Sequence, residues 1–391
     1  MHSLGIYVQV PFCASKCSFC NFSSRVEASR VFGRYTDALV QEIGRLPVYY
    51  EALGLGESVF TLPVDTVYFG GGTPPMLGAE KLEKIVGALH GRFEMCGEAE
   101  FTVEATPGSA DRQFLERALG MGMNRLSIGA QTFDDQELRA VGRLHSAADT
   151  RDLVETARGA GFNNLSIDLV AGLPRQTSES WRGNLEAVLR LAPQHISLYL
   201  FEIDEKSRLG REVMQHGTRF HADAVPGEEF MADAYESGRE ALGREGYVQY
   251  EISNFARPGY ESRHNLKYWR LAPYLGLGAG AHSFDGTRRW ANLEAAESYM
   301  HELARERTPI ADVRRLSPEE QVEEFFFLGL RQAEGVSLET ARKQWGEDAL
   351  SPWRGRIETL ARDGLLTARG DNFRLAETAY LVSNEVFQEF V

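Results

Sequence analysis

The chain of 391 residues carries 42 basic and 56 acidic side chains, a formal net charge of −14, and 43% of its residues are hydrophobic. This composition is that of an ordinary globular protein, and its acidity argues against general nucleic-acid binding. No apolar run reaches the roughly 18 residues of a membrane span, which leaves only peripheral membrane contact open, and the first ten residues read as a strand, not a signal peptide. With four cysteines and no export signal, we expect a cytoplasmic protein.

The first 200 residues alternate between short β-branched runs and longer amphipathic segments. The runs predict six strands, at residues 5–10, 65–69, 100–105, 125–130, 164–170 and 195–201. The segments between them predict helices at 34–46, 79–91, 111–121, 148–161 and 178–191, the fourth ending at Gly161. Repeated βα units of this size predict a parallel sheet, either a partial (βα)6 barrel or an open α/β sheet. In both, functional groups gather at the carboxyl ends of the strands.

The rest of the chain falls into two parts, which gives predicted domains at 1–202, 203–310 and 311–391. The middle part contains a helical stretch at 225–246 and a glycine-rich turn at 275–284, and we interpret it as an extension of the barrel. The last part predicts helices followed by a β-hairpin at 364–377, a small helical domain of the winged-helix kind. Because this part is not strongly basic, we expect it to act in packing or as a lid and not to bind nucleic acid.

Three cysteines in the run PFCASKCSFCNF give the strongest chemical signal: Cys13, Cys17 and Cys20. Three thiolates on one loop can bind three irons of a [4Fe-4S] cube and leave the fourth iron open to a small molecule. The alternatives are structural thiols or a zinc site, for which His2 is the nearby candidate for a fourth ligand. We interpret the remaining cysteine, Cys96, as a plain small side chain.

Further polar residues follow the other predicted strands. The segment GGGTPP (70–75) lets the backbone approach a ligand closely, or else forms only a tight turn. Glu104 and Asp168 lie in apolar strands, where they either bind an ammonium group or a ribose, or belong to buried ion pairs. Gln131 offers a neutral donor and acceptor, and Arg143 is a candidate partner for a carboxylate.

The segment HNLKYW (264–269) combines polar and aromatic side chains. His264 can bind iron through a neutral nitrogen, and Tyr268 and Trp269 offer flat faces to a large planar ligand. The alternative is a purely structural element of the fold. His282 is a second candidate for an iron ligand.

The cysteine run followed by GGGTP resembles the radical S-adenosylmethionine motif, C-x3-C-x-aromatic-C. Over nearly the whole chain, segments such as IYVQVPFC, YFGGGTPP, LSIGAQTF, IDLVAGLP and HNLKYW resemble the family of oxygen-independent coproporphyrinogen III oxidase and the related HemW heme chaperones. The resemblance implies a [4Fe-4S] cluster on Cys13, Cys17 and Cys20. It also implies that S-adenosylmethionine is contacted by Tyr7, Phe19, Gly71, Gly72, Thr73, Glu104, Gln131, Arg143 and Asp168.

Three features match the chaperone branch: the triad begins at residue 13, no fourth cysteine follows it directly, and HNLKYW fits the signature HNxxYW. They imply a protein that binds heme and passes it to an acceptor of unknown identity. The alternatives are radical decarboxylation of coproporphyrinogen III or another radical reaction on a tetrapyrrole, and a cluster protein without catalysis that docks a partner. Two positions depart from the family, Gln9 in place of the usual His and Asn21 in place of the usual Asp.

Overall fold

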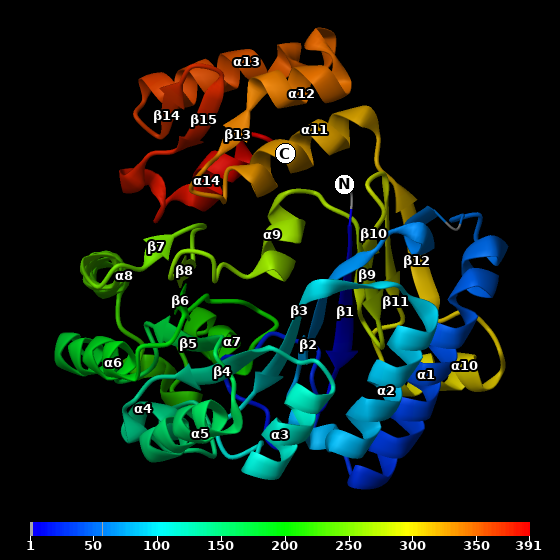
Figure 1. Cartoon of the computed structure of the whole chain (residues 1–391). Coiled ribbons are helices and arrows are strands. Elements are labelled where there is room, and N and C mark those ends of the chain that lie inside the picture. Colours follow the sequence, from blue (N-terminus) through cyan, green and yellow to red (C-terminus); the bar gives the residue numbers. More distant parts are fainter. Residues whose placement is uncertain (1–2, 57) are drawn as a thin grey trace.

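The computed structural model describes residues 3–56 and 58–391, and a curved sheet of twelve strands lies at its centre (Figure 1). The strand order is β12-β11-β10-β9-β1-β2-β3-β4-β5-β6-β8-β7. Six of these strands are parallel neighbours in chain order: β1 (Leu4–Val10), β2 (Val64–Gly71), β3 (Met95–Ala105), β4 (Arg125–Gln131), β5 (Leu165–Ala171) and β6 (His195–Leu200). They coincide with the six predicted strands, which confirms the parallel partial barrel.

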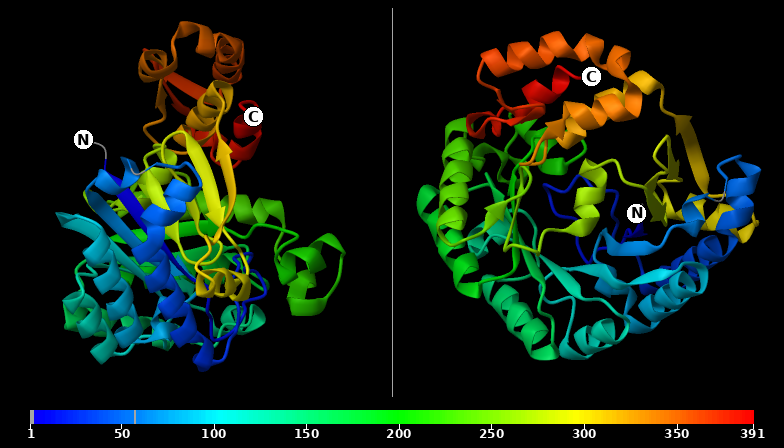
Figure 2. Two further views of the ribbon diagram at one scale, coloured as in Figure 1. Left: turned by 90° about the vertical axis from the view of Figure 1, so that its right-hand side faces the viewer. Right: turned by 45° about the horizontal axis from the view of Figure 1, so that its top comes forward.

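Helices follow these strands and lie on the outside of the curved sheet (Figure 2). They are α1 (Ser29–Ala52), α2 (Ala79–Arg92), α3 (Arg112–Gly120), α4 (Asp135–Ala140), α5 (Ala147–Ala160) and α6 (Ser178–Leu191), with short 3₁₀ turns η1 (Ser58–Thr61) and η2 (Pro74–Leu77). Capping boxes at Ser146 and Thr177 begin α5 and α6. Gly161, with φ at 117°, ends α5 in the left-handed conformation, as predicted.

The first helix is longer than predicted. It was expected over 34–46, but α1 continues through Pro47 to Ala52. Beyond the proline, Tyr49 and Tyr50 are 3% and 1% exposed. Burial of these two rings offsets the hydrogen bond that Pro47 cannot donate, so the helix does not end there.

The middle part of the chain adds six more strands to the same sheet. These are β7 (Val248–Gln249), β8 (Asn254–Ala256), β9 (Tyr274–Leu277), β10 (His282–Phe284), β11 (Arg288–Asn292) and β12 (Ile310–Arg315). The helices of this part are α7 (Arg208–Met214), η3 (Arg219–Ala224), α8 (Glu228–Arg244), α9 (Arg263–Trp269) and α10 (Ala296–Ala304). The sheet therefore runs across the boundaries predicted at 202 and 310.

The glycine-rich turn predicted at 275–284 is shorter than expected, because β9 and β10 occupy its two ends and only residues 278–281 join them. β9 pairs in parallel with β1, and β10 returns antiparallel. A Cβ on Gly276 would overlap the backbone of His282. This glycine thus permits two strands to approach closely, which a sequence pattern does not distinguish from a turn.

The C-terminal part forms a small helical unit above one end of the barrel (Figure 1). Its elements are α11 (Pro318–Gly329), β13 (Val336–Ser337), α12 (Leu338–Trp345), α13 (Glu347–Arg362), β14 (Leu366–Arg369), β15 (Asn372–Leu375), η4 (Glu377–Ala379) and α14 (Ser383–Gln388). The ring of Phe326 stacks on that of Phe390 at 4.9 Å in its core. Arg289 on β11 and Glu324 on α11 form a 2.7 Å ion pair that ties the unit to the sheet. In the described residues, no helix is both long and apolar enough to cross a membrane.

Candidate functional site

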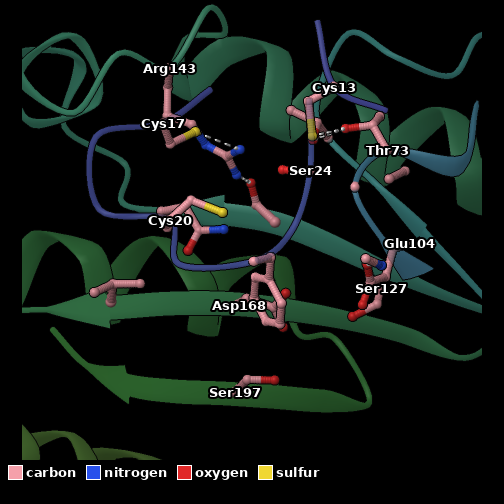
Figure 3. A pocket seen from close by; sticks show the side chains of 18 of the residues that line it. Cys13, Cys17, Cys20, Ser24, Thr73, Glu104, Ser127, Arg143, Asp168 and Ser197 are labelled. Carbon is pink, nitrogen blue, oxygen red and sulfur yellow. Dashed lines mark hydrogen bonds between the residues drawn. The ribbon is translucent and has the colours of Figure 1, made fainter. Parts of the chain in front are cut away.

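A cavity of about 820 Å³ lies within the curve of the sheet, a volume in the range of small-molecule sites (Figure 3). Its wall extends from the cysteine loop after β1 to Arg331, just beyond α11. All residues predicted to bind the cluster or S-adenosylmethionine line it: Tyr7, Cys13, Cys17, Phe19, Cys20, Gly71, Gly72, Thr73, Glu104, Gln131, Arg143 and Asp168. The fold thus brings these twelve residues, from the strands β1 to β5 and the segments between them, to one cavity.

The cysteine loop is held in place by backbone hydrogen bonds at both ends and in the middle. The amide of Cys13 donates to the carbonyl of Arg25 at 3.0 Å, and the amide of Arg25 donates to Pro11 at 2.8 Å, so the end of the loop pairs with its beginning. In the middle, the amide of Ser18 donates to Val141 at 3.0 Å. The loop therefore presents its thiols on a fixed backbone.

Each thiol of the triad has a donor at hydrogen-bonding distance. Arg143 Nη1 lies 3.6 Å from Cys17 Sγ, Lys16 Nζ lies 3.8 Å from Cys20 Sγ, and Thr73 Oγ1 lies 3.8 Å from Cys13 Sγ. Burial raises the pKa of Cys17, and the neighbouring Arg143 opposes this rise. Donors and cations of this kind stabilise thiolates, the form in which cysteine binds iron.

The sulfurs do not converge on one point. Within the described part of the chain, no three Cys, His, Asp or Glu side chains are placed to hold a single metal ion. A cubane binds its thiolates to separate irons, so its ligands stand farther apart than those of one ion. His2, the candidate for a fourth zinc ligand, lies outside the described residues.

Two glycines of GGGTPP bring the end of β2 against the start of the cysteine loop. Gly71 has φ at 97°, and an added Cβ there would overlap the side chain of Gln9. A Cβ on Gly72 would meet the backbone of Val10 and Phe12 at 2.6 Å. Only glycine permits this approach, so the motif positions the loop and leaves backbone groups at the cavity wall.

Glu104, on β3, is the best-defined acceptor in the cavity. Its Oε1 accepts from Tyr68 OH at 2.9 Å, and its Oε2 accepts from the amide of Gly71 at 3.0 Å. Burial raises its pKa to about 7, which the hydrogen bond from Tyr68 reduces only in part. A cation such as an ammonium group would restore the charged form, since it supplies the favourable interaction that burial removes.

Asp168 lies farther along the same wall, on β5. Burial raises its pKa, whereas a hydrogen bond from Ser197 and the charges of Arg125 and Arg143 lower it. Arg143 also donates to the carbonyl of Gly129. The pair of carboxylates and the arginines form a buried polar lining that can hold a ligand carrying both charges.

Gln131 ends β4 with φ at 70°, an unusual conformation for a residue other than glycine. A Cβ on Gly129 would lie 2.9 Å from Gln131 Nε2 and 2.9 Å from Arg143 Nη2. The glycine therefore makes room for both side chains beside the cysteine loop. Backbone strain at such a position is typical of ligand sites.

Several lining residues were missed, although a simple signal pointed to them. Alternate residues of a strand face the same side, and the cavity is lined by alternate residues of β4 and β6. These are Arg125, Ser127, Gly129 and Gln131 on β4, and His195, Ser197 and Tyr199 on β6. The prediction of Gln131 alone could have been extended backwards by two-residue steps to Arg125.

The residues predicted to contact heme lie elsewhere. His264 is 1% exposed; its Nδ1 lies 2.8 Å from Thr66 Oγ1 and its Nε2 lies 2.8 Å from Tyr268 OH. Neither His264 nor Tyr268 nor Trp269 lines the cavity, and His282 is exposed on β10. To bind iron, His264 would have to give up a ring hydrogen bond, so its role as a heme ligand stays a prediction. Asn265 alone of this segment reaches the cavity.

The two departures from the family pattern have ordinary partners. Gln9 Oε1 accepts from Tyr7 OH at 2.9 Å. Asn21 Nδ2 donates to Asp204 Oδ2 at 2.8 Å, which ties the cysteine loop to the segment after β6. The usual Asp at position 21 would place a second carboxylate against Asp204. Cys96 lies near the beginning of β3, at the end of the strand opposite Glu104, and does not line the cavity.

Comparison with known proteins places this cavity in a family. Residues 7–188 match the model of the radical SAM superfamily, and residues 316–382 match that of the HemN C-terminal domain. The chain is 34% identical over 386 residues to the heme chaperone HemW of Bacillus subtilis, with 98% of each chain covered. The chain belongs to the HemW family. Another HemW relative, from Escherichia coli, is 28% identical over 99% of this chain and 98% of its own.

Relatives of this family also occur in animals. The chain is 34% identical to a bovine protein, radical S-adenosyl methionine domain-containing protein 1, mitochondrial, over 92% of this chain and 81% of that protein. The solved structure of coproporphyrinogen III oxidase (HemN) from Escherichia coli has a TM-score of 0.85 and 23% identity, and covers 100% of this chain and 90% of its own. At that identity the match shows the fold alone.

Membership in the radical SAM superfamily implies a [4Fe-4S] cluster and S-adenosylmethionine as cofactors. The cavity fits both groups. Three thiols supplied with donors stand on one fixed loop, and glycines and a buried carboxyl line the adjoining wall.

Proposed function

We propose that this protein is a heme chaperone that binds heme, carries a [4Fe-4S] cluster with exchangeable S-adenosylmethionine, and passes heme to an acceptor protein. Identity with HemW relatives over 98% of the chain carries the proposal. The cavity that gathers all twelve predicted cluster and cofactor residues supports it.

Each residue has a proposed role that its surroundings support. Cys13, Cys17 and Cys20 would bind three irons of the cluster, and the fourth iron would be left open to S-adenosylmethionine. Glu104 would accept hydrogen bonds from the ammonium group, because its carboxyl lies buried beside that loop and, among the described residues, forms no ion pair. Tyr7, Phe19, Gly71, Gly72, Thr73, Gln131, Arg143 and Asp168 complete the wall around the cofactor. When bound, the cluster and S-adenosylmethionine supply an electron and a cleavable carbon–sulfur bond.

One cluster-loaded, anaerobic sample tests the proposal. It is titrated with heme, dialysed against S-adenosylmethionine, and assayed with coproporphyrinogen III and a reductant. We expect saturable heme binding, about four irons per chain and no protoporphyrinogen. Formation of protoporphyrinogen would favour the alternative, an oxygen-independent coproporphyrinogen III oxidase. Binding of S-adenosylmethionine without heme would leave a radical SAM protein that is no heme chaperone.

The cysteine assignment has a matched control in the fourth cysteine. Cys17→Ser should lose the iron of the reconstituted protein, because each thiolate of an open-site cube holds one iron. Cys96→Ser should keep it, since Cys96 lies outside the cavity. A full cluster in the Cys17→Ser variant would contradict the assignment.

A further inference from the structure

Two arginines that line the cavity, Arg125 and Arg331, have no part in the roles above. We call the part of the cavity where they lie its inner end. Arg125, the first residue of β4, is 2% exposed and lines the cavity. Its Nε has no hydrogen-bond partner, and among the described residues no ion pair involves it. A buried guanidinium keeps its charge, so its burial without a partner is costly. A ligand that brings an anion would remove this cost.

The nearest carboxylates do not serve as that anion. The charge of Arg125 lowers the pKa of Glu104 and of Asp168, so it acts on both carboxylates. It forms no ion pair with either of them. Glu104 is directed to Tyr68 and Gly71, and Asp168 receives a hydrogen bond from Ser197. When an ammonium group neutralises the charge of Glu104, less negative charge remains near the guanidinium of Arg125.

Arg331 reaches the same cavity from the C-terminal part of the chain. Its Nε is also buried without a partner. Its guanidinium lies over the ring of Trp269 at 4.7 Å and near that of Phe387 at 5.6 Å. Stacking uses the face of a guanidinium and leaves the N–H groups at its edge available to a carboxylate. Burial raises the pKa of Glu251 and the charge of Arg331 opposes this rise, but among the described residues the two form no ion pair. Trp269 thus holds Arg331 in place, although Trp269 itself does not line the cavity.

We propose that Arg125 and Arg331, with Asn265, which also lines the cavity, form a carboxylate subsite that binds the propionate groups of a tetrapyrrole. The inference rests on the proposed heme-binding function and deepens it. Arginine pairs with carboxylates through two parallel hydrogen bonds, and a tetrapyrrole of this class carries two such groups. The segment HNLKYW then acts as a positioning element, through Asn265 at the wall and Trp269 behind Arg331.

The test compares heme with its dimethyl ester, which keeps the ring and the iron but lacks both carboxylates. Cluster-loaded wild-type protein should bind heme about 10- to 100-fold more tightly than the ester, the range for hydrogen bonds between charged groups. Arg331→Gln should lose most of this preference while it retains S-adenosylmethionine. Trp269→Leu should weaken it in the same direction. Arg112→Gln, which changes an exposed arginine of α3, should keep it.

The fully buried Arg125 needs two variants, because loss of its charge can also disturb folding. Arg125→Lys should keep part of the preference for the free acid, and Arg125→Gln should abolish it. Equal binding of heme and ester by the wild type would overturn the subsite and leave heme binding standing. Loss of S-adenosylmethionine affinity in step with heme affinity would assign the arginines to the cofactor site and overturn the inference. No binding of either tetrapyrrole would overturn the proposed function and the subsite together.

Discussion

Replacement of Glu104 by glutamine tests the electrostatics of the cofactor wall. Burial raises the pKa of Glu104 from 4.5 to about 7. This difference corresponds to about 3 kcal/mol by which burial disfavours the charged form. Pairing with the ammonium group of S-adenosylmethionine requires that form, so binding below pH 7 must also release a proton.

The affinity for S-adenosylmethionine should depend on pH and should fall as the pH falls. With a pKa of about 7, roughly three quarters of Glu104 is ionised at pH 7.5 and roughly one tenth at pH 6.0. Affinity for S-adenosylmethionine should therefore fall about eightfold over this interval in the wild type. Glu104→Gln should bind more weakly at pH 7.5 and change little down to pH 6.0, because the variant has no proton to release.

Equilibrium dialysis of S-adenosylmethionine against cluster-loaded protein measures both profiles. Glu83→Gln, which changes an exposed glutamate paired with Arg117, is the control and should follow the wild type. Parallel profiles in wild type and Glu104→Gln would refute the reasoning, since the titrating group would then lie elsewhere. Unchanged affinity in Glu104→Gln at pH 7.5 would remove Glu104 from the ammonium site.

Three further outcomes are expected. Burial raises the pKa of Glu42 to about 7, so wild-type stability relative to Glu42→Gln should fall as pH rises, by about 2 to 3 kcal/mol between pH 5 and 8, in thermal unfolding. Gly71→Ala should lose about 1 to 3 kcal/mol in denaturant titration, and more than Gly78→Ala, which also has positive φ but open space around it. His264→Ala should lose about 2 kcal/mol of stability with its two ring hydrogen bonds; a changed Soret spectrum of bound heme would support His264 as the iron ligand, and unchanged heme affinity with an unchanged spectrum would remove it.

The outer end of the cavity is the part formed by the cysteine loop and the carboxyl ends of the strands. The sequence predicted this end well because strand termini build it. Parallel strands place their carboxyl ends together, so polar residues that end apolar runs are expected to lie close to one another. Cys13, Thr73, Glu104 and Gln131 each follow this rule and line one cavity. Their roles came from the family resemblance, but their proximity followed from the alternation of strands and helices alone.

The inner end of the cavity, where Arg125 and Arg331 lie, was not predictable in the same way. Arg331 comes from a turn after α11, and nothing in its neighbourhood in the sequence indicates that it enters the barrel. Trp269 holds it from a helix that was read only as a polar and aromatic cluster. Contacts of this kind depend on how separate parts of the chain pack, and no local period of hydrophobicity carries them.

The motif HNLKYW shows the limit of reasoning from residue type. A histidine in a polar and aromatic segment suggests a heme ligand, but both nitrogens of His264 are hydrogen-bonded in the fold, so iron binding would require one of these bonds to break. The outer end of the cavity offers thiols and carboxyls, which suit irons and an ammonium group. The inner end offers guanidinium groups, which suit carboxylates.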